Sequence, residues 1–302
     1  MYTQMLVPLD GSKLAENLLP YARVLAGALH CPIELLSVVD SMDSARTSHA
    51  GHVRSVDAIV QAAVQEGKRY LEGIARSFTG STVTCVVEQG QPEEVIIERA
   101  ARDKGTLIAM ATRGRSGIHR WLMGSVAEKV LRGATNPLLL VRGDEEGKSD
   151  GKATLKSIVV PLDGSRMAET VLPRAIDLAK KLSLEIVLTR AYQIPLSATY
   201  AGAETPYIPN NYALMDLVRD EASAYLEEKV NELHQNGVEK VSHILLVGSG
   251  ADEIIDLARS TPNNLIAMCT HGRSGVKRWA LGSVTEKVVR HSGDPVLVVR
   301  AE

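Results

Sequence analysis

Several features that mark particular classes of protein are scarce in this sequence. Aromatic residues make up 4% of the 302 residues, which leaves few platforms on which nucleic-acid bases could stack. Neither sign of charge dominates, because 34 Lys and Arg stand against 36 Asp and Glu. Such a balance argues against a nucleic-acid partner. No stretch of about 18 apolar residues occurs, so no segment is expected to span a membrane.

Cysteine is also scarce, and its placement indicates a compartment. Cys31, Cys85 and Cys269 are odd in number and widely spaced, so they predict neither a disulfide framework nor a paired metal-binding motif. The first residues contain no basic region followed by an apolar stretch, so no signal peptide is expected. With 45% hydrophobic and 23% charged residues, the composition is that of a globular protein. We therefore expect a protein of the reducing cytoplasm.

The chain repeats itself. Leu6–Ser12, with the sequence LVPLDGS, returns as VVPLDGS at Val159–Ser165. Met110–Arg142 returns as Met268–Arg300, with the same residue at 19 of the 33 aligned positions. This repeat is too long for the unit of a solenoid, so it predicts two complete domains that arose by duplication and fusion.

The boundary between the domains is marked by composition. Gly143–Lys152 is polar and charged and contains three glycines, which is typical of a flexible linker. We predict a first domain over residues 1–143, a linker over 144–154 and a second domain over 155–302.

Short apolar runs alternate with helical patterns in each half, for example the pattern over Ala15–Leu29. This alternation predicts an α/β fold with parallel strands. We expect five strands per domain, in the order 3-2-1-4-5, with helices on both faces. The predicted strands are Met5–Leu9, Ile33–Val39, Val83–Val87, Leu107–Ala111 and Pro137–Val141, then Ser157–Leu162, Leu184–Ala191, Val241–Val247, Leu265–Cys269 and Pro295–Val299.

The motif P-L-D-G-S follows the first strand in both halves, at Pro8–Ser12 and at Pro161–Ser165. In open parallel sheets, ligands bind beyond the carboxyl ends of the strands, where the strand order reverses. Asp10 and Asp163 stand at such ends, where a carboxylate could accept a hydrogen bond from a ribose hydroxyl. The same residues also fit a plain strand-to-helix turn, in which glycine supplies the turn and serine caps the helix.

A second motif follows the fourth strand. It is T-R-G-R-S-G from Thr112, followed by G-S-V from Gly124, and its twin is T-H-G-R-S-G from Thr270, followed by G-S-V from Gly282. Glycine lets the backbone approach a phosphate closely, and a helix N-terminus offers unpaired N–H groups and a positive dipole end. The alternative is a glycine-rich turn in which serine caps the helix.

Taken together, these motifs resemble the universal stress protein family in its tandem two-domain form. The resemblance covers the chain apart from the linker. It rests on the V-P-x-D-G-S start, the T-H-G-R-S-G turn, the G-S-V-x-E-K-V helix and the P-V-L-V-V-R end. It implies two Rossmann-like domains of the adenine nucleotide alpha hydrolase-like type. One branch of the family binds ATP through the pattern G-x2-G-x9-G-[ST], and another branch lacks the pattern and does not.

This chain meets most of that ATP-binding pattern. Its first glycine falls on Ala111 and on Cys269, and either residue would be strained if the position required a positive φ. The remaining positions carry the expected residues, namely Gly114, Gly124 and Ser125 in the first half and Gly272, Gly282 and Ser283 in the second.

The resemblance implies where a nucleotide would lie. Adenine would pack near the ends of strands one, two and four, ribose would meet the aspartate, and the phosphates would meet the glycines and the helix start. The implied residues are Pro8, Asp10, Val38, Met110, Ala111, Gly114, Gly124, Ser125 and Val126, then Pro161, Asp163, Ala191, Met268, Cys269, His271, Gly272, Gly282, Ser283 and Val284. Mg²⁺ would accompany ATP mainly through phosphate and water oxygens, and no separate protein metal site is expected.

Three functions remain open. The first is a cytosolic stress-response protein that binds ATP in one or both domains as a sensor or regulator and is not primarily an enzyme. The second is an interaction protein whose nucleotide sites have decayed, as Ala111 and Cys269 suggest. The third is an ATP-hydrolysing enzyme, although the S-G-G-x-D-S and H-I-G-H motifs of related ATP-cleaving families do not occur.

The last strand of each half is expected to take part in assembly. Strands Pro137–Val141 and Pro295–Val299 would leave sticky edges if they were unpaired. The resemblance implies that these last strands pair the two domains of one chain as a pseudo-twofold dimer. Further association of two chains into a homodimer stays open.

Overall fold

The structure is a computed structural model that describes residues 2–40, 56–113, 123–142, 153–193, 211–270 and 281–300. Ten strands form one sheet in the order β3-β2-β1-β4-β5-β10-β9-β6-β7-β8. Their bounds are β1 Gln4–Pro8, β2 Ile33–Val39, β3 Val83–Gln89, β4 Thr106–Ala111, β5 Leu138–Val141, β6 Ser157–Pro161, β7 Glu185–Tyr192, β8 Val241–Val247, β9 Asn264–Cys269 and β10 Val296–Val299. The predicted linker lies outside the described residues as far as residue 152.

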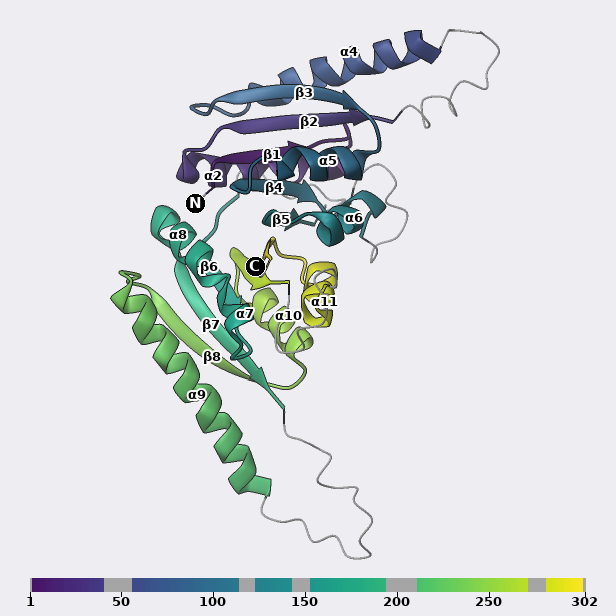
Figure 1. Ribbon diagram of the computed structural model, residues 1–302. Helices are drawn as coiled ribbons and strands as arrows, with labels where there is room; N and C mark the ends of the chain where they lie inside the picture. Colours follow the sequence, from purple (N-terminus) through teal and green to yellow (C-terminus); the bar gives the residue numbers. More distant parts are fainter. Residues whose placement is uncertain are drawn as a thin grey trace, which may run out of the picture.

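Each half has the predicted strand order. All strand pairs within a half are parallel, and β1 lies between β2 and β4 just as β6 lies between β7 and β9. The halves meet where β5 and β10 run antiparallel, with Leu139 opposite Leu297. The predicted pairing through the last strands is therefore confirmed, and Figure 1 shows the first half above the second.

Helices cover both faces of the sheet. One face packs against α1, α2 and α4 of the first half and α7, α8 and α9 of the second, and the other face packs against α5, α6, α10 and α11. The bounds are α1 Lys13–Glu16, α2 Leu19–Leu29, α4 Val56–Ala75, α5 Pro92–Ala101, α6 Ser125–Gly133, α7 Arg166–Glu169, α8 Leu172–Leu182, α9 Asn211–Gln235, α10 Gly250–Ser260 and α11 Ser283–His291.

Burial follows position in the sheet. Every residue of the central strands β4, β5, β9 and β10 is buried, as expected for strands that are covered on both faces. The outer strands β3 and β8 are only partly buried. Among the described residues, no helix is both long enough and apolar enough to cross a bilayer.

The helical pattern predicted over Ala15–Leu29 is present, but it is interrupted by a turn at residues 17–18. The chain forms α1 and then α2, which begins at Leu19 with a proline in its first turn. Proline has no N–H to donate and its ring clashes with the preceding turn, so it is tolerated at a helix start and not in the interior. Pro173 has the same effect at the start of α8.

Candidate functional site

A pocket of about 720 Å³ opens in the second half, at the carboxyl ends of β6, β7 and β8. This volume lies within the range of small-molecule sites, roughly 300–1,000 Å³. The pocket is bounded by α9, α10 and α11. Its lining includes four residues that the family resemblance implies, namely Asp163, Ala191, Ser283 and Val284.

The aspartate at the end of β6 shapes a turn. Asp163 Oδ1 accepts hydrogen bonds from the backbone N–H of Ser165, at 2.9 Å, and from its hydroxyl, at 2.6 Å. Ser165 Oγ in turn accepts from the backbone N–H of Ala168 and caps α7. Gly164 has a φ of 84°, a conformation that glycine adopts at little cost.

The first half repeats this turn. Asp10 Oδ1 accepts from the backbone N–H of Ser12 at 3.0 Å and from its hydroxyl at 2.6 Å. Gly11 has a φ of 79°, and Ser12 caps α1. The strand-to-helix turn is therefore present in both halves. The contact of Asp10 and Asp163 with a ribose stays a prediction.

Each helix that follows the second motif is preceded by a glycine. Gly282 is the N-cap residue of α11 and Gly124 is the N-cap residue of α6, and neither has a side chain to cap the helix. Ser283 and Ser125 take the first helical position. The alternative in which serine caps these helices is therefore wrong. The N–H groups of the first turn can serve an anion.

Backbone hydrogen bonds hold these helix starts against the sheet. The N–H of Gly282 donates to the carbonyl of Thr270 at 2.8 Å, and the N–H of Gly124 donates to the carbonyl of Thr112 at 2.8 Å. In the second half, the Thr285 hydroxyl also donates to the carbonyl of Cys269 at 2.8 Å. Each helix start is thus fixed beside the end of the fourth strand of its half.

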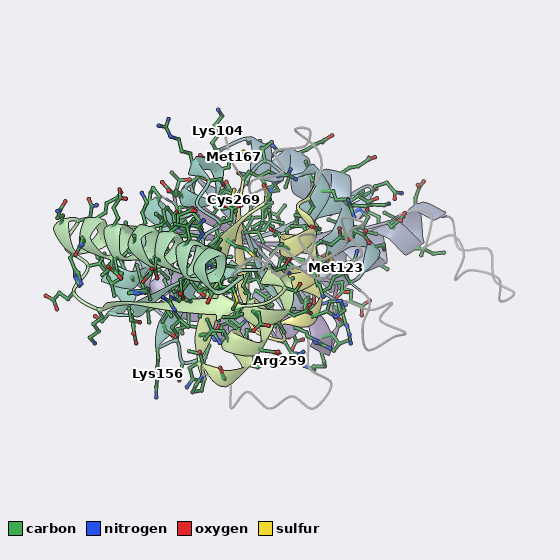
Figure 2. All side chains as sticks on the ribbon, turned by 90° about the horizontal axis from the view of Figure 1, so that it is seen from below. Lys104, Met123, Lys156, Met167, Arg259 and Cys269 are labelled. Atoms are coloured by element: carbon green, nitrogen blue, oxygen red, sulfur yellow. The ribbon has the colours of Figure 1, made fainter. Side chains whose placement is uncertain are left out.

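The two positions that lack the family's glycine are not strained. In the described part of the chain, the non-glycine residues with a positive φ are His30, Ser183 and Asn263, so Ala111 and Cys269 have ordinary strand backbones. Their exposed fractions are 8% and 5%. Cys269, which is labelled in Figure 2, is buried, and its sulfur accepts a hydrogen bond from the Thr170 hydroxyl at 3.3 Å.

The remaining implied residues divide into three groups. Met110 and Met268, with exposed fractions of 5% and 4%, are buried in the core at the strand ends, and their contact with adenine stays a prediction. Pro8, Val38, Pro161, Gly124, Gly282 and Val126 are partly exposed at strand ends and helix starts. Gly114, His271 and Gly272 lie outside the described residues.

Charged residues that the sequence analysis did not select also line the pocket, namely Arg190, Glu221 and Lys287. Arg190 lies in the apolar run of the predicted strand Leu184–Ala191, and no local pattern marks it as a pocket residue. Lys287 belongs to the G-S-V-x-E-K-V helix, and this motif was the only sequence signal that could have pointed to it. Lys287 Nζ lies 2.6 Å from Asp252 Oδ1. The hydrogen bond from Lys287 holds the pKa of the Asp252 carboxyl below its usual range.

The structure is a tandem pair of Rossmann-like α/β domains, and the second domain has a pocket at its strand ends. The chain belongs to the universal stress protein family, whose sequence model matches residues 1–142 and 154–300. The resemblance is therefore confirmed.

Individual relatives agree with this membership. A universal stress protein of Methanocaldococcus jannaschii is 30% identical over 156 residues, which cover 50% of this chain and 85% of the relative. One of Mycolicibacterium smegmatis is 22% identical over 239 residues, which cover 79% of this chain and 76% of the relative. The crystal structure of a universal stress protein from Archaeoglobus fulgidus superposes over 100% of both chains with a TM-score of 0.70 and 20% identity, which supports the fold.

Proposed function

We propose that this universal stress protein binds ATP in one or both halves and acts in the cytoplasm as a nucleotide-dependent sensor or regulator of the stress response. The observation that carries the proposal is the pocket of the second half. Asp163, Ala191 and Ser283 come from three distant parts of the chain and line one cavity of about 720 Å³. They are three of the residues for which the family resemblance implies contact with ribose, adenine and phosphate.

Each wall of the pocket suits one part of a nucleotide. The start of α11 offers backbone N–H groups and the positive end of its dipole to the phosphates. Lys287 lies one turn further along the same helix and adds a positive charge. Ala191 at the end of β7 offers a small apolar surface to the base, and Asp163 lies on the neighbouring strand end for the ribose.

Mg²⁺ would come with the nucleotide in this proposal. The described residues contain no group of three or more His, Cys, Asp or Glu side chains that could hold a metal ion. Magnesium commonly keeps several waters and binds through substrate phosphates. It would then neutralise phosphate charge at the start of α11.

The test is calorimetric titration of the whole protein with Mg·ATP, using Ser283→Asp and the matched variant Ser125→Asp. Both serines are exposed at the first position of a helix. An aspartate there favours the helix but repels a phosphate, so a loss of binding does not reflect unfolding. We expect Ser283→Asp to weaken ATP binding by about tenfold or more, which corresponds to about 1.4 kcal/mol. The effect of Ser125→Asp shows whether the first half also binds.

A negative result has a clear meaning. Protein purified without added nucleotide and then denatured should release adenine nucleotide. If none is released and titration gives no heat, the chain is an interaction protein with decayed sites. Turnover of ATP above background, lost in Asp163→Ala, would instead establish an enzyme.

A further inference from the structure

An arginine side chain forms part of the pocket wall in the second half. Arg190 lies near the end of β7, and its side chain is only 9% exposed. Its guanidinium stacks on the Tyr225 ring at 5.1 Å, and Nη2 donates to Glu221 Oε1 at 3.2 Å. That is its one hydrogen bond to the described residues, although a guanidinium carries five N–H donors.

The partner of this arginine compensates its charge weakly. The Glu221 side chain is 68% exposed, and an ion pair with a solvated carboxylate contributes little. Burying a charge is costly unless it is paired and hydrogen-bonded. Within the described part of the chain, Arg190 is therefore a buried cation with donors to spare at the wall of a cavity.

The fold does not require an arginine here. Pro161 pairs in register with Thr189, and its counterpart Pro8 pairs with Leu36. The residue that corresponds to Arg190 in the first half is therefore Ser37. There, Gly67 of α4 stands so close that an added Cβ would lie 3.4 Å from Ser37 Oγ. The first half thus forms the same sheet and helices with a short neutral side chain.

Arg190 approaches the pocket from the side opposite α11. Its contacts, Glu221 and Tyr225, both belong to α9, which covers one face of the sheet, whereas α11 covers the other. Asp163 follows β6, the strand between β7 and β9. The N–H of Leu162 donates to the carbonyl of Thr189 at 2.8 Å. Asp163 and Arg190 therefore follow paired positions of two neighbouring strands, and both line the pocket.

We propose that the pocket of the second half selects adenine nucleotides that carry an additional phosphate on the ribose, and that Arg190 binds this phosphate. The inference rests on the proposed function, in which α11 holds the 5′-phosphates and Asp163 lies at the ribose. A guanidinium matches a phosphate with two parallel hydrogen bonds. The first half, with Ser37, has no such preference.

The test compares ligands that differ only by that phosphate. The full chain carrying Ser125→Asp, in which the first site is blocked, is titrated with adenosine 5′-monophosphate, adenosine 3′,5′-bisphosphate and adenosine 2′,5′-bisphosphate at one ionic strength. A charge-assisted hydrogen bond corresponds to about tenfold or more in affinity. We expect one bisphosphate to bind at least about tenfold more tightly than the monophosphate, and its identity shows which ribose hydroxyl faces Arg190.

Variants assign this preference to the arginine. Arg190→Ser introduces the residue of the first half and should reduce the ratio of bisphosphate to monophosphate affinity to near one. Arg190→Lys keeps the charge and should lower this ratio partway. The matched control is Arg174→Ser, because Arg174 lies in the same half as Arg190 and its guanidinium also covers a tyrosine ring, that of Tyr2 in the first half, at 5.0 Å from the ring centroid. This control should retain the full ratio.

A variant that is expected to raise the affinity, rather than lower it, separates ligand binding by Arg190 from packing. Glu221→Gln removes the carboxylate that occupies Arg190 Nη2 and should raise the affinity for the bisphosphate. If Arg190 only packs against α9, Glu221→Gln and Arg190→Ser should both leave the ratio unchanged, and the inference is overturned. Equal binding of all three ligands by the unmodified pocket also overturns it while nucleotide binding stands. If none of the three ligands binds while the unmodified chain still binds Mg·ATP, the inference alone is overturned. If the unmodified chain binds no Mg·ATP either, the proposed function itself is contradicted.

Discussion

Ala111 and Cys269 each close a strand that is buried on both faces. The family pattern has glycine at this position, and glycine is often retained because only it tolerates a positive φ. Neither residue has a positive φ here. The methyl group of Ala111 and the thiol of Cys269 therefore contribute packing without backbone strain.

Restoring glycine should lower stability without improving binding. Ala111→Gly and Cys269→Gly remove buried atoms and loosen the unfolded chain, so we expect the free energy of unfolding to fall by roughly 1–2 kcal/mol in each case. Urea denaturation measures this loss, and titration with ATP should give an unchanged affinity. Ala109→Gly, in the middle of β4, is the control for the substitution alone. A gain in affinity at residue 111 but not at 109 would show that the added Cβ obstructs the ligand.

The sequence predicted some of the pocket residues and missed others for a physical reason. Asp163 and Ser283 follow from turn and helix-start chemistry, which is local. Arg190 lies in an apolar run, and only the register of β7 against β6 shows that it corresponds to Ser37. Met268 is the last residue but one of β9 and is buried, and no local pattern gives that depth.

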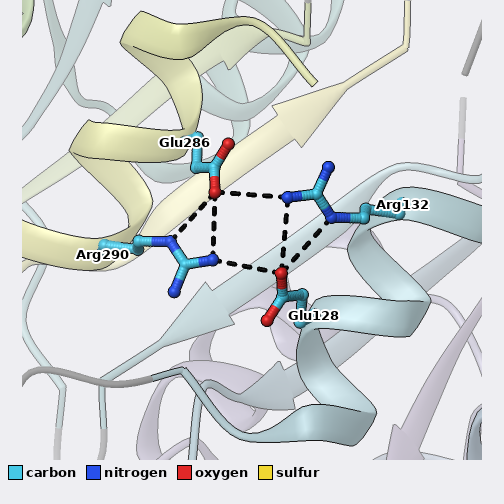
Figure 3. Close-up of polar contacts among 4 residues, drawn as sticks. All are labelled: Glu128, Arg132, Glu286 and Arg290. Atoms are coloured by element: carbon cyan, nitrogen blue, oxygen red, sulfur yellow. Dashed lines mark hydrogen bonds and ion pairs between the residues drawn. The ribbon is translucent and has the colours of Figure 1, made fainter. Parts of the chain in front are cut away.

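Two helices from different halves meet beside the junction of the sheet. Glu128 and Arg132 of α6 form a square of ion pairs with Glu286 and Arg290 of α11, as Figure 3 shows. All four side chains are partly exposed, so each pair contributes little to stability. The square links the two helices whose starts are the proposed phosphate sites.

Arg300 of the second half connects the halves through three hydrogen bonds to backbone carbonyls of the first half. This residue follows β10, and its guanidinium donates to the carbonyls of Leu131, Arg132 and Ala134 at 2.9, 2.5 and 2.7 Å. Carbonyls at a helix end have no partner within the helix. The second half therefore caps the last turn of α6 in the first half.

Arg300→Met should loosen α6 specifically. The variant leaves three carbonyls without their charged donor, and we expect a loss of about 1.5–3 kcal/mol in stability. Hydrogen–deuterium exchange should accelerate in the amides of α6 more than in α2. Glu128→Gln, which removes one corner of the ion-pair square, is the control and should leave the exchange of the last turn of α6 nearly unchanged. Equal exchange in both variants would argue that solvent satisfies these carbonyls equally well.

The ten strands join the two halves into one structural unit. Both core clusters contain residues from each half, and β5 and β10 are buried where they pair. The sequence repeat predicted two five-stranded domains and, through the family resemblance, their pairing. The continuity of the core across the junction could not be predicted, because it depends on contacts between residues such as Leu139 and Leu297 that lie far apart in the chain.

A continuous core should make the halves unfold together. The chain has two tryptophans, Trp121 in the first half and Trp279 in the second, so Trp121→Phe and Trp279→Phe each leave a fluorescent probe in one half. We expect the two urea transitions to coincide, as in a cooperative two-state protein.

Saturating ATP should raise both transition midpoints together, because a ligand that binds only the folded state stabilises the whole cooperative unit. With Ser283→Asp added, the shift caused by the second site should disappear at both probes. Two separate transitions, with ATP moving one of them, would instead mean that the sheet joins domains that respond to nucleotide independently.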